Sequence, residues 1–385
     1  MQSPAKKQKS SGSAAEAENL TPLQLHLIWI LQSNDTLSPW KLLTIQDENL
    51  REYYNALEAL NKHEYVHYKD GKVVLTDKGR KVFDSAVGEH KDGAELVAPW
   101  KGLACAHCET RGYVMPKCES PFRNSVIASG GLLQKFKELL KSRPEPAEDF
   151  DQTSITPEDA YIRVGFFLER GDLVGKELLM IGDFDCLSLI ACLSGLVKRA
   201  VVLEGDARLV DYLNAMAKQH KLPLQAIKFD VREGLPKGIA GQFDVFSCDP
   251  VETLEAGIKL FLSRGTEGLR EKGVLHFGLT TLEASKKKWR DIQRVLLDMN
   301  YVVTDCRRNF NGYPDTGLEV SHEFHRKMAH VATPDCVWYW ASLIRAELVG
   351  AATDIPFLGP YKGTSDIYLD EEAWATPTKT ATSKV

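Results

Sequence analysis

The sequence predicts an α/β fold with a mainly parallel sheet, preceded by a small helical domain that ends in a β-hairpin. From residue 151 onward, short apolar runs alternate with longer amphipathic runs, which is typical of a parallel sheet covered by helices on both faces. Nearer the N-terminus, three helix-like segments precede two short β runs around Asp70-Gly71, a strong hairpin signal. A length of 385 residues suits two or three domains.

Composition and charge exclude several classes of protein. The chain is 43% hydrophobic and 26% charged, with a net charge of −5, which argues against a non-specific nucleic-acid binder. It has no run of eighteen apolar residues, so we expect no membrane span. Residues 1–19 lack the apolar core of a secretory signal and read as a disordered tail. The eight cysteines are scattered, which suits a reducing, cytoplasmic location.

Residues 20–88 are predicted to form a winged-helix-like domain. Helices are expected over 20–32, 38–43 and 49–65, followed by a hairpin over 66–76. A helix that reads a DNA groove should be basic, but in the third helix the basic Arg51 and Lys62 are balanced by acidic residues. A dimerisation or lid role is therefore favoured over DNA binding.

Residues 89–150 are predicted to be a linker that contains a Cys-x-x-Cys segment. Cys105 and Cys108 have the spacing of a zinc knuckle, and Cys118 lies nearby. A second Cys-x-x-Cys pair is missing. Two interpretations stay open, a structural zinc site and a pair of reduced cysteines in a turn.

Residues 151–348 are predicted to be the catalytic domain. A helix over 156–173 leads into alternating strands and helices, with strands expected over 176–182, 199–206, 224–229, 242–250 and 273–280. Two further strands, over 300–310 and 336–347, add a final antiparallel strand, which is typical of the Rossmann-like sheet of adenosylmethionine-dependent transferases. Residues 349–385 are predicted to be a flexible, acidic C-terminal region.

Carboxylates follow every predicted parallel strand. Ligands of an open parallel sheet bind beyond the carboxyl ends of its strands, so these acids should meet at one edge. They are Asp183 and Asp185 after the first strand, Glu204 and Asp206 at the second, Asp230 after the third, Asp249 and Glu252 after the fourth, and Glu283 after the fifth.

Some of these acids also have ordinary structural interpretations. Asp206 can cap the following helix, Asp230 can end a strand, and Glu283 can sit in the first turn of a helix. Glu204 is different, because an acid at the end of the second strand commonly binds both ribose hydroxyls of a nucleoside. The turn after the first strand holds only one glycine, Gly182, and so lacks a phosphate-binding loop.

The charge of the cluster indicates a cationic ligand, because like charges in a cleft repel one another unless something positive binds there. Decarboxylated adenosylmethionine is a dication, whereas intact adenosylmethionine carries a carboxylate that Asp183 and Asp185 would repel. An amine acceptor, with a pKa of about 10.4 for a lysine-like group, must lose a proton before it attacks. Asp185 and Asp249 are the candidate bases, and the sulfonium leaves without help from a metal.

The sequence resembles the branched-chain polyamine synthases, and the resemblance runs from about Asp151 to Glu347. The matching stretches are GDFDCLSLIACLSGLVKR, LEGDARL, FDVR, GQFDVFSCDPVETL, LFLSRG and FGLTTLEASKKKW. The resemblance implies transfer of aminopropyl groups from decarboxylated adenosylmethionine to the central nitrogen of spermidine, with methylthioadenosine as co-product. It also implies a homodimer.

The resemblance also implies roles for residues. The base of the family falls on Asp185, and the family's acid after the fifth strand falls on Glu283. The acidic C-terminal region of the family corresponds to Asp366, Asp370, Glu371 and Glu372, as candidate polyamine contacts. We therefore expect catalysis by Asp185 and Asp249, donor binding by Gly182, Asp183, Glu204, Asp206 and Asp230, and acceptor binding by Asp183, Asp185, Asp249, Glu252 and Glu283.

Three positions depart from the pattern of the family. Phe184 replaces the middle acid of its Gly-acid-acid-acid signature, and Val251 replaces the second proline of its later Asp-Pro-Pro-Glu motif. His276 stands where the family usually has a tyrosine. We expect these changes to lower the charge and alter the shape of the acceptor pocket while leaving Asp185 and Asp249 in place.

Two other functions remain as alternatives. An adenosylmethionine-dependent N-methyltransferase would use the same fold on an amine, but the acids at Asp183 and Asp185 disfavour it. A transcriptional regulator would join a winged helix to a polyamine-sensing domain, but the balanced charges of the third helix disfavour it.

Overall fold

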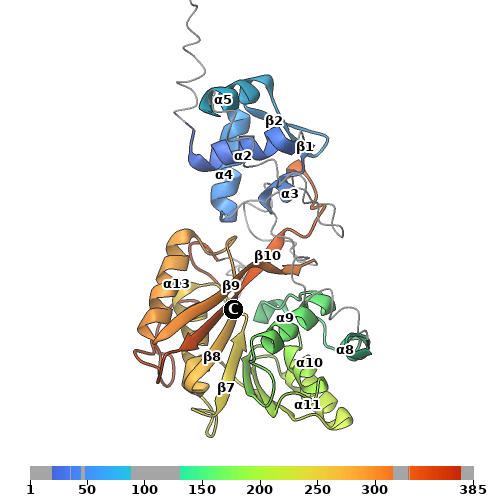
Figure 1. Ribbon diagram of the computed structural model, residues 1–385, viewed down its shortest axis with the longest axis vertical. Coiled ribbons are helices and arrows are strands. Elements are labelled where there is room, and N and C mark those ends of the chain that lie inside the picture. The colour runs from blue at the N-terminus through green and yellow to red at the C-terminus, as the bar shows by residue number, and fades with distance from the viewer. Residues whose placement is uncertain are drawn as a thin grey trace, which may run out of the picture. The chain divides into compact units, whose positions relative to one another are not determined.

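The computed structural model describes residues 20–34, 36–44, 48–87, 131–314, 328 and 330–373. The chain divides into two compact units (Figure 1). Unit 1 comprises Met1–Val114 and Phe324–Cys336, and unit 2 comprises Met115–Glu323 and Val337–Val385. None of the helices in the described ranges combines the length and apolarity needed to cross a bilayer.

Unit 1 combines helices with a small antiparallel sheet whose strand order is β1-β3-β2. Its elements are α2 (Pro22–Asn34), β1 (Thr36–Leu37), α3 (Pro39–Leu43), α4 (Leu50–Lys62), β2 (Val66–Lys69), β3 (Lys72–Leu75) and α5 (Asp77–Val87). Asp70 and Gly71, which join β2 to β3, have φ values of +51° and +70°. Positive φ at both central residues is what a tight two-residue hairpin requires, so the predicted hairpin is confirmed.

A later part of the chain completes unit 1. Residues 330–336, which precede β10, hydrogen-bond to the N-terminal elements. The indole Nε1 of buried Trp40 donates to the carbonyl of Ala332 at 2.6 Å, and the Lys72 ammonium lies 3.1 Å from Asp335 Oδ2. Unit 1 therefore depends on residues that are far apart in the sequence.

Unit 2 is built on a seven-stranded sheet with strand order β6-β5-β4-β7-β8-β10-β9. The strands are β4 (Glu177–Ile181), β5 (Arg199–Glu204), β6 (Leu224–Lys228), β7 (Phe243–Cys248), β8 (Leu269–Thr280), β9 (Tyr301–Tyr313) and β10 (Tyr339–Leu348). Strands β4 to β8 pair in parallel, and β10 runs antiparallel to both of its neighbours. The predicted parallel sheet with one antiparallel strand near its edge is confirmed.

Helices cover both faces of this sheet (Figure 1). They are α8 (Gly131–Leu140), α9 (Pro157–Glu169), α10 (Leu187–Leu193), α11 (Ala207–His220), α12 (Lys259–Gly268) and α13 (Lys286–Asp298), with short helical turns at Glu148–Phe150 and Leu254–Ile258. Helices α8 to α11 share one apolar core with the sheet, and α12 and α13 share the other. All five residues of β4 are buried, as expected of a central parallel strand.

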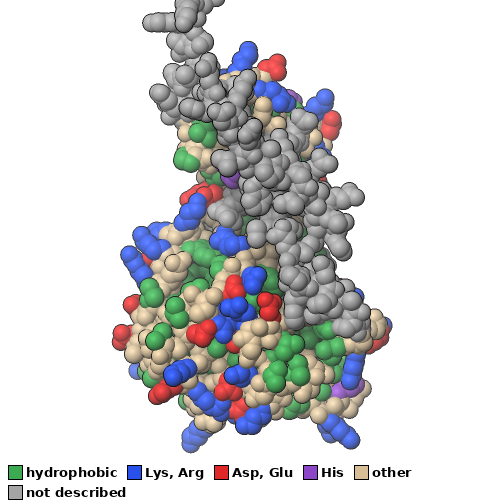
Figure 2. Space-filling model, in the orientation of Figure 1, with side chains coloured by type: hydrophobic (Ala, Val, Ile, Leu, Met, Phe, Trp, Pro, Cys, Tyr) green, Lys and Arg blue, Asp and Glu red, His purple; other side chains and the backbone are tan. Residues whose placement is uncertain are grey.

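The surface of unit 2 has mixed charge. On the face drawn in Figure 2, basic and acidic side chains are interspersed over the described part of the unit. Such a mixture agrees with the small net charge of −5 for the whole chain. On this face the described side chains form no concentrated basic stripe of the kind on which phosphate-backbone binding depends.

Helix α12 packs closely on β7 because Gly265 has no side chain. A Cβ atom at Gly265 would lie 1.8 Å from the ring of Phe246, which is fully buried in the core. This close approach sets the distance between the helix and the sheet beside the fourth parallel strand.

We predict that Gly265→Ala destabilises the protein. Alanine is the better helix former, but crowding Phe246 should outweigh this and lower the free energy of unfolding by about 1–3 kcal/mol. The matched control is Gly131→Ala in α8, where the added methyl group meets open space. Urea unfolding of both variants checks the prediction, and an increase in stability for Gly265→Ala would contradict it.

Candidate active site

A cavity of about 520 Å³ lies in unit 2 at the carboxyl ends of the parallel strands. Strand β4 stands between β5 and β7, so the connections on its two sides diverge there, which is where open α/β sheets bind ligands. Eight of the nine sequence-predicted site residues in the catalytic domain line this cavity: Gly182, Asp183, Asp185, Glu204, Asp230, Asp249, Glu252 and Glu283.

Asp206, the remaining one, does not line the cavity. Its side chain caps α11 by accepting the N–H of Arg208 at 2.9 Å, and it also pairs with the Arg208 guanidinium. Its expected role in donor binding therefore has no support from the geometry, and the helix-cap interpretation describes its place.

The turn after β4 is organised by Asp183. Gly182 has a φ of +70° and Cys186 a φ of +56°, so the chain reverses tightly before α10 begins. The two carboxyl oxygens of Asp183 accept the N–H groups of Leu187 at 2.8 Å and Ser188 at 3.2 Å. Burial raises the pKa of Asp183 to about 8, although these hydrogen bonds lower it. Asp183 therefore holds the N-terminus of α10 at the cavity wall.

Asp185 and Asp249 are brought to the same part of the cavity. Asp185 Oδ1 accepts the backbone N–H of Ile155 at 3.0 Å. Burial raises the pKa of Asp185 to about 7, and neighbouring Asp249 raises it further, whereas Arg163 lowers it. A carboxyl group with this pKa can accept a proton near neutral pH.

Arg163 lines the cavity and is absent from the sequence-predicted site residues. It comes from the middle of α9, is 1% exposed, and places Nη1 2.6 Å from Asp249 Oδ2. Arg163 precedes its partner by 86 residues in the chain, so no pattern close to the strand ends points to it. The available signal was a lone arginine in the otherwise apolar run Tyr161–Leu168.

The end of β5 contributes Glu204. Its two oxygens accept the backbone N–H groups of Asp206 at 2.8 Å and Asp183 at 3.1 Å, and burial raises its pKa. At the end of β6, Asp230 forms a paired contact with Arg232, which lowers the pKa of Asp230. These two acids mark the side of the cavity next to β5 and β6.

The side next to β8 holds a second pair of acids. Glu252 Oε1 accepts the N–H of Thr280 at 2.6 Å, and Glu283 Oε1 accepts the hydroxyl of Tyr339 at 2.9 Å. Burial raises the pKa of Glu252 well above its usual value, and Glu283 raises it further. Tyr313 and Tyr339, which the sequence analysis also missed, pair across β9 and β10 with ring centroids 5.4 Å apart.

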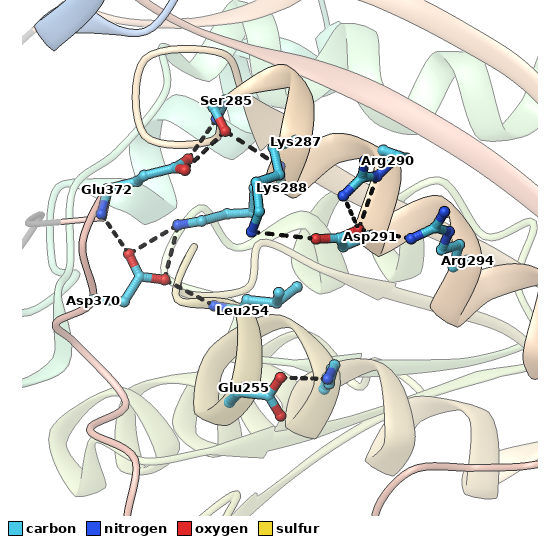
Figure 3. Close-up of polar contacts among 11 residues, drawn as sticks. Leu254, Glu255, Ser285, Lys287, Lys288, Arg290, Asp291, Arg294, Asp370 and Glu372 are labelled. Atoms are coloured by element: carbon cyan, nitrogen blue, oxygen red, sulfur yellow. Dashed lines mark hydrogen bonds and ion pairs between the residues drawn. The ribbon is translucent and has the colours of Figure 1, made fainter.

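Lys288 holds the C-terminal segment against the rest of unit 2 (Figure 3). The ammonium, on a side chain 5% exposed, donates to both oxygens of Asp370 at 2.8 and 2.9 Å and to the carbonyls of Glu252 and Glu283. Although burial raises the pKa of Asp370, Lys288 holds it below its usual range. Glu372 accepts the N–H and the hydroxyl of Ser285.

In the described part of the C-terminal region, these contacts do not agree with the prediction of a flexible segment. Residues 350–373 are fastened at several points; in addition to the Lys288 contacts, Arg264 donates to the carbonyls of Phe357 and Gly359. Asp370 and Glu372 serve as anchors, and neither lines the cavity, whereas Asp366 does. The segment from Thr364 to Tyr368 forms part of the cavity wall.

The three departures from the family pattern lie in different surroundings. Phe184 and Val251 line the cavity, and the Arg143 guanidinium lies 4.2 Å from the centroid of the Phe184 ring. His276 does not line it. Its buried ring lies 2.8 Å from Asp172 Oδ2 and packs against Phe167, so the expectation that it shapes the acceptor pocket is corrected.

The candidate zinc ligands Cys105, Cys108 and Cys118 lie outside the described residues. Within the described ranges, no cluster of three His, Cys, Asp or Glu residues has the geometry to hold a metal ion.

Comparisons with known proteins agree with this site. Residues 131–375 match the family model described as "Branched-chain polyamine synthase A C-terminal domain". Two curated relatives carry the name N(4)-bis(aminopropyl)spermidine synthase. The one from Thermococcus kodakarensis is 34% identical over 88% of this chain and 90% of its own length. The one from Thermus thermophilus is 39% identical over 67% of this chain and 73% of its own length.

A solved structure is similar over almost the whole chain. It is the branched-chain polyamine synthase from Thermus thermophilus in complex with N4-aminopropylspermidine and 5′-methylthioadenosine. The two chains are 31% identical and superpose with a TM-score of 0.72, covering 95% of this chain and 99% of that one.

We predict that Lys288→Met loosens the C-terminal segment. Loss of the buried ammonium leaves Asp370 without its cation, which should cost about 1.5–3 kcal/mol of unfolding free energy. Amide hydrogen exchange across residues 360–373 should become faster. The control is Lys287→Met, because Lys287 is 76% exposed and lies 3.6 Å from Asp291. Equal exchange in the two variants would argue against the anchoring role.

Proposed function

The chain belongs to the branched-chain polyamine synthase family, and we propose that it transfers aminopropyl groups from decarboxylated S-adenosylmethionine to the central nitrogen of spermidine. The products are a branched polyamine and 5′-methylthioadenosine. The observation that carries the proposal is one cavity with a nucleoside-type acid, Glu204, on one side, the acid pair Glu252 and Glu283 on the other, and Asp185 and Asp249 also lining it.

The donor is proposed to bind beside β5 and β6. Glu204 ends the second parallel strand, and its carboxylate oxygens retain lone pairs for the two ribose hydroxyls after accepting backbone N–H groups. Phe150, Phe229 and Val231 line the same part of the cavity and offer apolar surface to the adenine ring. Asp230 and Gly182 complete this subsite, which decarboxylated S-adenosylmethionine enters as a co-substrate.

The chemistry is proposed to use Asp185 as the base. The neutral acceptor nitrogen forms a bond to the carbon beside the sulfonium, and the carbon–sulfur bond breaks with its electron pair going to sulfur. Before this attack, the protonated acceptor amine gives a proton to the Asp185 carboxylate, and the tertiary ammonium formed by the transfer is released protonated. The buried position and intermediate pKa of Asp185 suit proton acceptance near neutral pH.

The acceptor is proposed to bind beside β8. Glu252 and Glu283 are both buried, and two neighbouring carboxylates in one low-dielectric site are stabilised when a cation binds between them. A primary ammonium of a polyamine is such a cation. Tyr339, which donates to Glu283, orients one carboxylate of the pair.

The same charges disfavour the intact donor. Intact adenosylmethionine would bring its carboxylate into a cavity that Asp185 and Asp249 line. Like charges repel strongly in a partly buried site, so these carboxylates disfavour an N-methyltransferase function.

Unit 1 is proposed to be a winged-helix module that serves assembly. Its first three helices, the hairpin and the small sheet suit that fold, and the third helix, α4, has balanced charge. Glu58 on α4 accepts the hydroxyl of Tyr68 from the hairpin, so this acid is part of the packing of the module. We propose that the protein works as a homodimer.

We predict that donor choice separates the candidate functions. Incubation with spermidine and decarboxylated S-adenosylmethionine should give a mass gain of aminopropyl units and release 5′-methylthioadenosine, read by mass spectrometry. The intact donor should give no product, because its carboxylate faces an acidic wall. A methyl gain from the intact donor would instead establish the methyltransferase function.

We predict a pH dependence that belongs to Asp185. The carboxyl must be ionised to accept a proton, so kcat/KM should fall as the pH drops through about 7. Asp185→Asn should abolish proton acceptance at this position and lower kcat by about 10²- to 10⁴-fold. Initial rates at saturating donor across the pH range check this. Unchanged activity of Asp185→Asn would assign the base elsewhere.

A further inference from the structure

We propose that Arg163 is a positioning residue for the transfer: it holds Oδ2 of Asp249 so that Oδ1 accepts an N–H of the attacking amine. This inference rests on the proposed function. It deepens that function by assigning the orientation of the nucleophile to a buried cation on α9 and to the glycine that faces it across Asp249.

The contact between Arg163 and Asp249 is built into the core. The Arg163 side chain is 1% exposed, and its Nη2 also donates to the carbonyl of Cys248, the last residue of β7. Burial lowers the pKa of Arg163, but Asp249, Tyr313 and Asp185 together raise it above its usual value, so the guanidinium stays charged. A buried arginine with two contacts at one strand end fixes the direction of the carboxylate that follows.

The second oxygen of Asp249 remains available. No described residue donates a hydrogen bond to Oδ1, and the Asp249 side chain is 32% exposed at the cavity. Oδ1 lies over Gly278 of β8, where a Cβ atom would come within 2.2 Å of it. Only glycine at 278 leaves room for Asp249 in this orientation.

The same helix also fixes the opposite wall. Asp159, one turn before Arg163, accepts the N–H of Gly312 at 3.2 Å through Oδ2, which secures the end of β9 beside Tyr313. Residues four apart lie on one face of a helix. One buried face of α9 therefore positions both the carboxylate after β7 and the aromatic wall from β9.

Asp249 and Asp185 then have different roles in the transfer. Asp249, held by Arg163 through Oδ2, accepts an N–H of the amine at Oδ1, which aims the nitrogen lone pair at the carbon beside sulfur. Asp185 takes the other proton of the protonated amine before the carbon–nitrogen bond forms. The charged and titratable groups near Asp185 are Asp249 after β7, Arg163 on α9, Arg143 after α8, Asp183 in the turn before α10, and Tyr313 on β9.

The test compares Arg163→Gln with Arg163→Lys and with a control, Arg170→Gln, at the partly exposed end of the same helix. Misplacing the amine by about 1 Å should lower kcat of Arg163→Gln by about 100-fold. Affinity for 5′-methylthioadenosine, measured by calorimetry, should stay at the wild-type level. Arg170→Gln should keep wild-type kcat.

The pH dependence of kcat/KM supplies a second measurement, which should not change if the role of Arg163 is purely structural. Arg163 lowers the pKa of Asp185 and Asp249 raises it. The acidic limb of kcat/KM should therefore move to higher pH in Arg163→Gln and to lower pH in Asp249→Asn. Arg163→Lys keeps the charge and should leave the limb in place while kcat stays reduced, because lysine cannot reproduce the two-point contact.

Gly278→Ala tests the orientation of the Asp249 carboxylate by crowding Oδ1, and it does not remove a buried charge. It should lower kcat and keep the affinity for 5′-methylthioadenosine, and it decides the question if Arg163→Gln does not fold. Wild-type kcat in Gly278→Ala, or a wild-type rate and unmoved limb in Arg163→Gln, would overturn the positioning role. Failure of the wild-type protein to release 5′-methylthioadenosine would instead contradict the proposed function.

Discussion

Unit 2 places several carboxylates around one partly buried cavity, and its structure must offset the free-energy cost of removing these charges from water. A charged group that leaves water must find hydrogen bonds or an opposite charge, or else take up a proton. Here Ile155 and Thr280 each supply a backbone N–H to one acid, and Asp183 takes two such groups from α10. Two buried cations, Arg163 and Lys288, offset part of the remaining charge.

These partners come from segments that are far apart in the chain. Arg163 reaches the end of β7 from α9, and Lys288 joins the C-terminal segment to the turns that carry Glu252 and Glu283. The parallel sheet provides the common edge, and the long-range contacts set which oxygen of each acid stays accessible. Ligand recognition therefore depends on tertiary packing as much as on the acids themselves.

Much of the fold and most of the acidic residues of the site could be predicted from the sequence. Alternating strand and helix patterns predict the sheet, and an acid after each parallel strand must lie at one edge of it. The sequence could not show which acids have structural partners, and so Asp206 was assigned to the donor. Arg163 and Tyr339 were missed because their partners lie 86 and 56 residues away in the chain. His276 was assigned to a pocket although its partner, Asp172, lies 104 residues earlier.

The return of residues 330–336 to unit 1 bears on how the protein is made. Trp40 and Lys72, synthesised early, find Ala332 and Asp335 only after the ribosome has added most of unit 2. The first unit to emerge is thus completed late, and the chain passes three times between the units. Deleting the N-terminal 114 residues would leave residues 330–336 without Trp40 and Lys72, so a minimal catalytic fragment must also replace this segment.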